Sequence, residues 1–342
     1  MVLARLPDAP DGVKGISLFL VPKYLVNEDL SLGERNSLEA ASIEHKLGIH
    51  GCATCVMNFE DARGYLVGEM NQGLSCMFTM MNDARIGVAC ESVAIAERAY
   101  QQALTFAKDR VQGEAHGQKG RVTIIHHPDV RRMLLKMRSH IEIMRVLVYV
   151  NTLELDLAEE DQGHSKRADL LTPITKGWCS ELCQEITSIG LQIHGGMGYV
   201  EETGAAQHFR DSRITTIYEG TTGIQANDLI GRKVIGDQGQ ELRKLIADIS
   251  SEINTLDAHE NRLQLIKESM IHSIAVVEKS LDYILQEQPN DPFLAGSVSY
   301  SFLMMMGTFM GGWIATRSAS LAIINLKNTE DSEFYEAKLV SS

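Results

Sequence analysis

The sequence predicts a mainly α-helical protein: the remnant of a β-barrel or sheet domain, then an antiparallel four-helix bundle, then an additional helical region. Three observations predict it. Short apolar runs separated by Pro, Gly and Asp fill about the first 62 residues, apolar residues then recur at steps of three and four, and further helical patterns follow Gly236. We expect three domains: a partial β domain over 1–65, the bundle over 66–236, and an extra helical domain over 237–342 that is cut short.

Length and composition are those of a globular protein, with 342 residues, 44% hydrophobic and 23% charged. The net charge is 32 − 45 = −13, which disfavours non-specific binding to nucleic acid or to an anionic membrane. The six cysteines follow no disulfide framework, and the first residues do not have the pattern of a signal peptide. We therefore expect a cytoplasmic protein.

The β region is expected to hold strands at Val2–Leu6, Ile16–Val21 and Cys55–Phe59. This is too little chain for a self-sufficient sheet. Because a strand opens the chain, we expect the sequence to begin partway through a larger domain.

The first long helix is expected over 71–110, with one apolar stripe that includes Met81 and Val88. Arg85 falls on that stripe, and a buried cation is costly unless an anion meets it. Two explanations remain open: a structural ion pair with another helix, or a site for an anionic ligand or a catalytic carboxylate.

The second helix is expected over 127–160, with Pro128 in its first turn. Its basic residues predict a solvated face, and a nucleic-acid surface is the alternative. No aromatic residues are interleaved to stack on bases. The basic residues are Arg131, Arg132, Lys136, Arg138 and Arg145.

The third helix is expected over 170–196, ending at a glycine pair, and the fourth starts near Thr222. Long helices with short connections indicate an antiparallel bundle. Further helices are expected at 241–256, 260–288, 296–326 and 332–342.

The stretch 296–326 is the most apolar part of the chain. Its uninterrupted apolar run is about 14 residues, shorter than the roughly 20 that cross a bilayer. We expect a buried helix and no membrane, with Gly307 and Gly311 allowing close helix packing.

Glu219 stands alone among small residues, between the β-branched run Ile214–Ile217, expected to be extended, and a helix start. A carboxylate there is explained either as a helix cap or as a general base. Loss of hydration would raise the pKa of such a base toward neutrality. Gly220 would let a flat cofactor or a thioester approach the backbone.

The segment from Leu191 to Lys233 reads "LQIHGGMGYVEETGAAQHFRDSRITTIYEGTTGIQANDLIGRK". It resembles the acyl-CoA dehydrogenase family, whose signature is I-x-G-G-x-G-[YF], then R-D, then I-Y-E-G-T-x-x-I-Q. The resemblance covers about 1–235, and the region after 240 resembles the extra helical domain of a long bacterial subgroup. It implies that the family's N-terminal helical domain and much of its β domain are missing from this chain.

The resemblance implies an activity. Glu219 matches the family's base, which removes the α-proton of an acyl-CoA thioester while the β-hydrogen passes as hydride to FAD, giving a trans-2-enoyl-CoA. Gly220, Asn82 and Arg85 match positions at the substrate site.

The resemblance also implies an FAD site and an assembly. In the family two subunits contribute to each FAD site, so we expect a homodimer or homotetramer, with an electron-transfer flavoprotein as electron acceptor. Gln112 and Gly223 depart from the family's usual threonine and glutamine. The positions that match FAD contacts are Arg110, Gln112, His127, Gln192, Gly195, Gly196, Thr221 and Gly223.

Two other functions stay open at this stage. One is a DNA-associated flavoprotein on the same scaffold, and the other is a non-catalytic helical oligomerisation fragment. No metal site is expected, because Cys52 and Cys55 have no second pair at zinc spacing.

Overall fold

The computed structural model describes residues 1–256, 261–326 and 331–342. The chain divides into two compact units, Met1–Ala84 and Arg85–Ser342, and each is described by itself. The predicted domain boundaries at 65 and 236 stay predictions. The predicted start of a helix at residue 260 lies outside the described residues.

The first unit is built from short antiparallel strands. The three predicted strands are confirmed and end within one residue of their predicted bounds, whereas four further strands were not predicted. Most of their side chains are exposed, so they lack the apolar alternation that marks a half-buried strand. One sheet has the order β1 (Val2–Arg5), β2 (Ile16–Leu20), β7 (Tyr65–Val67), and two hairpins pair β3 (Tyr24–Val26) with β4 (Leu32–Arg35) and β5 (Leu38–Ile43) with β6 (Cys55–Phe59).

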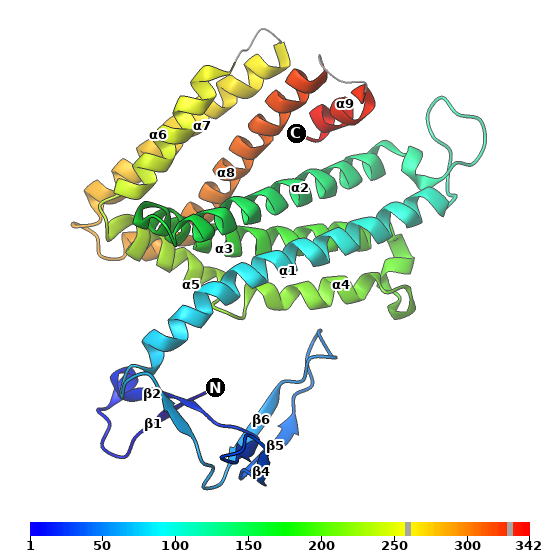
Figure 1. Cartoon of the computed structure of the whole chain (residues 1–342). Coiled ribbons are helices and arrows are strands. Elements are labelled where there is room, and N and C mark those ends of the chain that lie inside the picture. Colours follow the sequence, from blue (N-terminus) through cyan, green and yellow to red (C-terminus); the bar gives the residue numbers. More distant parts are fainter. Residues whose placement is uncertain (257–260, 327–330) are drawn as a thin grey trace. The chain divides into compact units, whose positions relative to one another are not determined.

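The predicted bundle is present (Figure 1). Its helices are α1 (Gly73–Asp109), α2 (Pro128–Leu157), α3 (Gln162–Ile193), and α5 (Thr222–Asn227), which continues into the π-helical segment η6 (Asp228–Ile235). The face of α1 that enters the core is lined by small residues, and this lets α3 approach closely. The buried alanines of α1 are Ala89, Ala96, Ala99, Ala103 and Ala107.

Helix α3 starts eight residues earlier than predicted, at 162 instead of 170. The carboxylate of Asp161 accepts a hydrogen bond from the Gly163 backbone N–H at 2.7 Å and so caps the helix. The short helix α4 (Ala205–Ser212) between α3 and α5 was not predicted.

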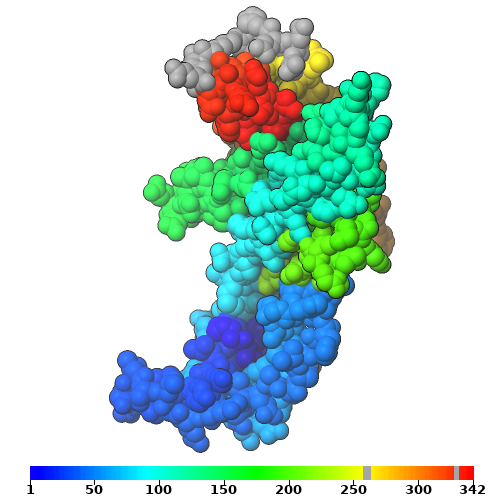
Figure 2. All heavy atoms as spheres, turned by 90° about the vertical axis from the view of Figure 1, so that its right-hand side faces the viewer, coloured from blue at the N-terminus to red at the C-terminus, as the bar shows by residue number. Residues whose placement is uncertain are grey.

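The C-terminal helices form layers against the bundle. They are α6 (Gln240–Thr255), α7 (Asn261–Glu287), α8 (Leu294–Leu326) and α9 (Ser332–Ser341). Helix α8 packs on α2, α3 and α5, and α7 packs on α8. Helix α9 lies against α8 and α2 (Figure 2). The Lys338 ammonium of α9 is 2.8 Å from the Glu142 carboxylate of α2.

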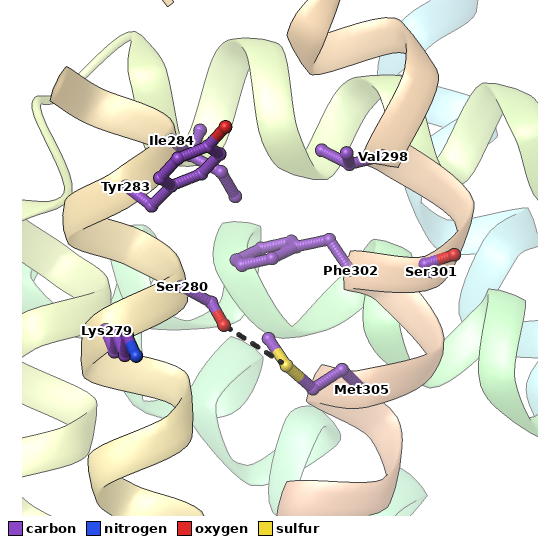
Figure 3. A pocket seen from close by; sticks show the side chains of 8 residues that line it. All are labelled: Lys279, Ser280, Tyr283, Ile284, Val298, Ser301, Phe302 and Met305. Carbon is purple, nitrogen blue, oxygen red and sulfur yellow. Dashed lines mark hydrogen bonds between the residues drawn. The ribbon is translucent and has the colours of Figure 1, made fainter. Parts of the chain in front are cut away.

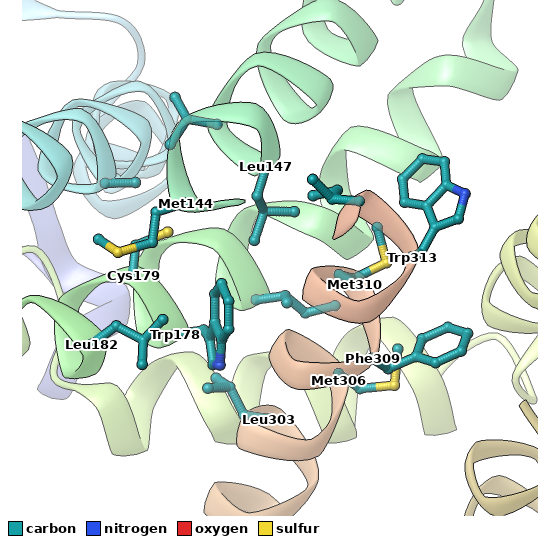
Figure 4. Packing of buried hydrophobic residues seen from close by; sticks show 14 of the residues in the cluster. Met144, Leu147, Trp178, Cys179, Leu182, Leu303, Met306, Phe309, Met310 and Trp313 are labelled. Carbon is teal, nitrogen blue, oxygen red and sulfur yellow. The ribbon is translucent and has the colours of Figure 1, made fainter. Parts of the chain in front are cut away.

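Helix α8 is long and apolar enough to cross a membrane by length and composition, and 56% of its most apolar window is buried inside the protein. It contributes to one hydrophobic core with α2 and α3, and Figure 4 shows Trp178 beside Leu303 in that core. A Cβ added at Gly307 would overlap the Trp178 ring, and one at Gly311 would lie 3.0 Å from the same ring. The predicted close packing at these glycines is confirmed.

Candidate active site

The turn between η5 (Arg213–Thr216) and α5 carries Glu219 in an unusual backbone conformation. Its φ is +52°, in the left-handed region, and Gly220 follows with φ +90°. A non-glycine residue in this region costs about 1–3 kcal/mol and persists only where its surroundings hold it. Residues in such strained conformations cluster at functional sites. The backbone conformation therefore marks the half-buried Glu219 as a candidate site residue.

The residue that caps α5 is Thr221, not Glu219. The Thr221 hydroxyl accepts a hydrogen bond from the Ile224 backbone N–H at 3.2 Å. The interpretation of Glu219 as a helix cap is therefore wrong, and its carboxylate does not have that structural role.

The predicted extended run before the turn is also wrong. Residues Arg213–Thr216 form a 3₁₀ turn, and Ile217 is in the right-handed helical region. The hydroxyls of Thr215 and Thr216 donate to the carbonyls of Ser212 and Arg213, three residues back. These local bonds offer the backbone an alternative to an extended strand, which β-branching alone does not reveal.

Two buried side chains hold the carbonyls of the turn. The Lys176 ammonium, from α3, donates to the Gly220 carbonyl at 2.7 Å. The Gln225 amide donates to the carbonyls of both Glu219 and Gly220 at 3.2 Å. Both Lys176 and Gln225 are 0% exposed, so hydrogen bonds from buried side chains hold the turn in place.

The lysine is perturbed by this setting. Burial and, to a lesser extent, the nearby Arg85 cation lower the pKa of Lys176 from 10.5 to about 8, although the carboxylates of Glu181 and Glu219 act in the opposite direction. Lys176 is thus a buried cation whose charge responds to pH near the physiological range. It also couples electrostatically to Glu219.

Arg85 forms a structural ion pair. Its guanidinium donates to the Asp228 carboxylate on η6 at 2.8 Å, and both side chains are almost fully buried. Arg232 contacts the other oxygen of Asp228 at 2.6 Å. The structure thus supports the ion-pair explanation of the cation on the apolar stripe, and a substrate contact by Arg85 stays a prediction. Asn82 is exposed on α1, in the unit of residues 1–84.

Further hydrogen bonds tie the turn to α1 and α3. The Tyr218 hydroxyl donates to the Glu91 carboxylate on α1. The Thr222 hydroxyl donates to the Glu181 carboxylate on α3 at 2.6 Å. Gly220 is required here, because an added Cβ would meet the Gln225 amide nitrogen at 2.7 Å.

A second group of predicted site residues lies where α1 and α3 end. Arg110 and Gln112 flank Val111, which forms an isolated β-bridge with Thr123, and the His127 ring donates to the Gln112 carbonyl at 2.7 Å. The end of α3 joins this region through the ring contact of His194 with Phe106, whose centroids are 4.5 Å apart. The residues at this end are Arg110, Gln112, His127, Gln192, Gly195 and Gly196.

The two groups are far apart on one chain. Lys176 contacts the turn between η5 and α5 that carries Glu219, called the base turn below. Gln192 is sixteen residues further along α3, which corresponds to about 24 Å along the helix axis. Glu219, Gly220, Thr221 and Gly223 therefore lie beside the middle of α3, and the remaining predicted FAD positions lie near its C-terminal end. A single copy does not bring all predicted cofactor residues together.

Both groups leave room for a ligand against the backbone. An added Cβ at Gly195 or Gly196 would have nothing within 4 Å, and at Gly223 it would meet only the Thr221 hydroxyl at 3.8 Å. Thr221, Gly223, Gly195 and Gly196 are exposed. These residues fit a flat anionic cofactor.

The basic face of α2 is largely neutralised by ion pairs. Arg132 pairs with Asp129, Lys136 with Glu185, Arg138 with Glu142, and Arg145 with Glu97. A surface that binds nucleic acid needs basic side chains that can reach phosphates. The arrangement favours the solvated-face interpretation.

A cavity of about 430 Å³ lies elsewhere, between α7 and α8. Figure 3 shows Tyr283, Phe302 and Met305 around it, with the Ser280 hydroxyl 3.8 Å from the Met305 sulfur. None of the predicted site residues lines it. Within residues 1–256, 261–326 and 331–342, no group of three or more His, Cys, Asp or Glu could hold a metal ion.

Comparisons with known proteins decide the family. Residues 71–234 match the family described as acyl-CoA dehydrogenase, C-terminal domain, and residues 240–342 match the one described as acetyl-CoA dehydrogenase C-terminal like. The chain belongs to the acyl-CoA dehydrogenase family. The first match contains the turn that carries Glu219 and the positions predicted to contact FAD, and the second contains α6 to α9.

Two curated members of this family align with nearly the whole chain. The 3-methylmercaptopropionyl-CoA dehydrogenase of Ruegeria pomeroyi is 45% identical over 349 aligned positions, covering 100% of this chain and 59% of the relative. A broad-specificity linear acyl-CoA dehydrogenase of Mycobacterium tuberculosis is 33% identical, covering 99% of this chain and 60% of the relative. The chain therefore spans about three fifths of the length of these relatives.

The crystal structure of Caenorhabditis elegans ACDH-11 is similar in fold, with a TM-score of 0.80 at 21% identity. That match covers 99% of this chain and 55% of the other.

Proposed function

We propose that the protein oxidises an acyl-CoA thioester to the trans-2-enoyl-CoA, with Glu219 as the base and FAD as the cofactor. The observation that carries this proposal is the strained turn. Glu219 is held in a left-handed conformation by buried donors, within a segment that matches the family. The carboxylate has no capping role that would otherwise explain its position.

The chain's own groups would act as follows. The Glu219 carboxylate takes the α-proton, and its backbone N–H donates to the thioester carbonyl oxygen, on which negative charge develops. Gly220, which matches a substrate contact of the family, would lie against the thioester with its backbone. Asn82 and Arg85 complete the proposed substrate contacts.

FAD, when bound, supplies the acceptor for the β-hydrogen, which leaves its carbon with the electron pair. Thr221 and Gly223 would hold it at the base end of one copy. Its other contacts would come from a second copy, through Arg110, Gln112, His127, Gln192, Gly195 and Gly196. The family resemblance supports an electron-transfer flavoprotein as the partner that receives the electrons. A cytoplasmic location is part of the same proposal.

A panel of acyl-CoA thioesters tests this function. The flavin-loaded protein is mixed with saturated thioesters of different length and branching, and reduction of an electron-accepting dye is followed with and without each thioester. We expect dye reduction that depends on the thioester, with the 2-enoyl-CoA as product. Flavin-loaded protein that reduces no dye with any member of the panel would contradict the proposal.

A further inference from the structure

The base turn is held by a cation that no part of the proposed chemistry uses. Lys176 reaches the turn from the middle of α3, and its ammonium donates to the Gly220 carbonyl at 2.7 Å. The side chain is 0% exposed. A buried ammonium costs free energy unless its charge is used or paired, yet within the part of the chain that the structure describes no carboxylate forms an ion pair with Lys176.

The surroundings of Lys176 contain charges of both signs. Arg85 on α1 acts against its charge, although Arg85 is itself paired with Asp228 on η6. Glu181 on α3 and Glu219 on the turn favour its charge. On the side of α8, the neighbouring Gly177 packs against the apolar Leu303. Glu219 is thus one of the two carboxylates that act on this lysine.

We propose that Lys176 is a positioning residue for Glu219: it holds the Gly220 carbonyl, fixes the left-handed turn, and places a positive charge beside the base. This inference rests on the proposed function. Gln225 shares the task of holding the carbonyls, but its amide carries no charge. Of the two side chains that donate to the carbonyls of the turn, Lys176 is therefore the one whose charge can change with pH.

A pH dependence follows. Burial and Arg85 lower the pKa of Lys176 to about 8. Above that pH the ammonium becomes a neutral amine, its hydrogen bond to Gly220 weakens, and the carboxylate of Glu219 loses a neighbouring cation. We expect turnover to fall as the pH rises through about 8.

Three variants of the flavin-loaded protein test the inference. Lys176→Met fills the same space without charge or donor, Lys176→Gln keeps a donor without the charge, and Lys233→Met removes a different lysine of the bundle, which pairs with Asp169. We expect Lys176→Met to lower kcat about tenfold to a hundredfold and to lose the alkaline fall in kcat. Lys176→Gln should recover part of kcat without the alkaline fall, and Lys233→Met should keep both.

A second measurement needs no turnover. The ionisation of lysines is followed by NMR in protein that carries isotope-labelled lysine, with Lys176→Gln to assign the signal. We expect one lysine to titrate near pH 8, and its signal to be absent from the variant. A Lys176 that titrates only near 10.5 would overturn the inference, even if Lys176→Met fails to fold.

The inference and the proposed function can fail separately. If wild-type protein shows no thioester oxidation, or if Glu219→Gln is as active as wild type, the proposed function fails. If Glu219→Gln is inactive but Lys176→Met keeps normal kcat and the alkaline fall, only the role of Lys176 is overturned.

Discussion

At the scale of single residues, the buried ammonium of Lys176 gives the protein a stability that depends on pH. Its pKa is about 8 in the folded protein and 10.5 when exposed. Between these values the unfolded chain binds more protons than the folded chain, so stability rises with pH in this window. The cost of burying the charge is present below pH 8 and disappears as the lysine becomes neutral.

The buried charge predicts how the difference in stability between wild type and Lys176→Met changes with pH. The free energy of unfolding of wild type minus that of Lys176→Met should rise by about 3 kcal/mol between pH 8 and 10.5. Urea unfolding at a series of pH values measures it, and other groups that titrate in this range cancel in the difference. The matched variant Lys233→Met should show a much smaller change. A difference for Lys176→Met that is flat across the window would contradict the buried charge.

The sequence identified Glu219 as a candidate site residue but did not identify Lys176. Glu219 was found because its neighbours form a motif with fixed spacing. Lys176 was missed, although it stands in the apolar run "LLTPITKGWC" and carries the same signal that singled out Arg85. The hydrogen bond from Lys176 to Gly220 joins residues 44 positions apart, and no periodicity along the chain predicts such a contact.

At the scale of the elements, hydrophobic periodicity predicted the long helices well and the strands poorly. The strands β3, β4, β5 and β7 are short and largely exposed, so their sequences carry little apolar alternation. The 3₁₀ turn before Glu219 was predicted to be extended because β-branched residues favour strands. The threonine hydroxyls that close the turn leave no periodic pattern in the sequence. Helices buried along one full face leave a clear pattern, and turns held by local side-chain bonds do not.

The packing of α8 on α3 gives a prediction with a matched control. Gly307→Ala should lower the free energy of unfolding by about 1–3 kcal/mol, because its Cβ would overlap the Trp178 ring in a packed core. Gly296→Ala, on the same helix, has nothing within 4 Å of an added Cβ and should raise stability by up to about 1 kcal/mol. Denaturant unfolding of both variants measures this. Equal effects would show that α8 does not pack on Trp178 in this way.

At the scale of the whole molecule, the residues at the base turn and those near the C-terminal end of α3 lie far apart. This separation predicts that the active form contains at least two copies of the chain. The base turn and the C-terminal end of α3 are about 24 Å apart on one copy, and in the proposed function a second copy completes the FAD site. The sequence supplied the residues through the family motif. The family resemblance also predicted that two subunits share each FAD site, and the length of α3 shows how far apart the two groups lie on one copy.

Mixed assemblies of two inactive variants test this division. Glu219→Gln removes the base from one chain, and Arg110→Ala removes a predicted FAD contact from the other. In a mixed pair, one site combines the intact Glu219 of one chain with the intact Arg110 of its partner, so co-expression should restore part of the activity. Activity no higher than that of either variant alone, in samples shown by light scattering and mass spectrometry to contain mixed pairs, would rule out sites shared between copies.

The most direct test of the proposed base is the reaction of Glu219→Gln with an acyl-CoA that the wild-type protein oxidises. Glutamine keeps the size of the side chain but cannot accept the α-proton. Reduction of bound flavin by the thioester should slow by about 10²–10⁴-fold, while flavin content and thioester binding stay close to those of wild type. Flavin reduction by Glu219→Gln at the wild-type rate would contradict the account.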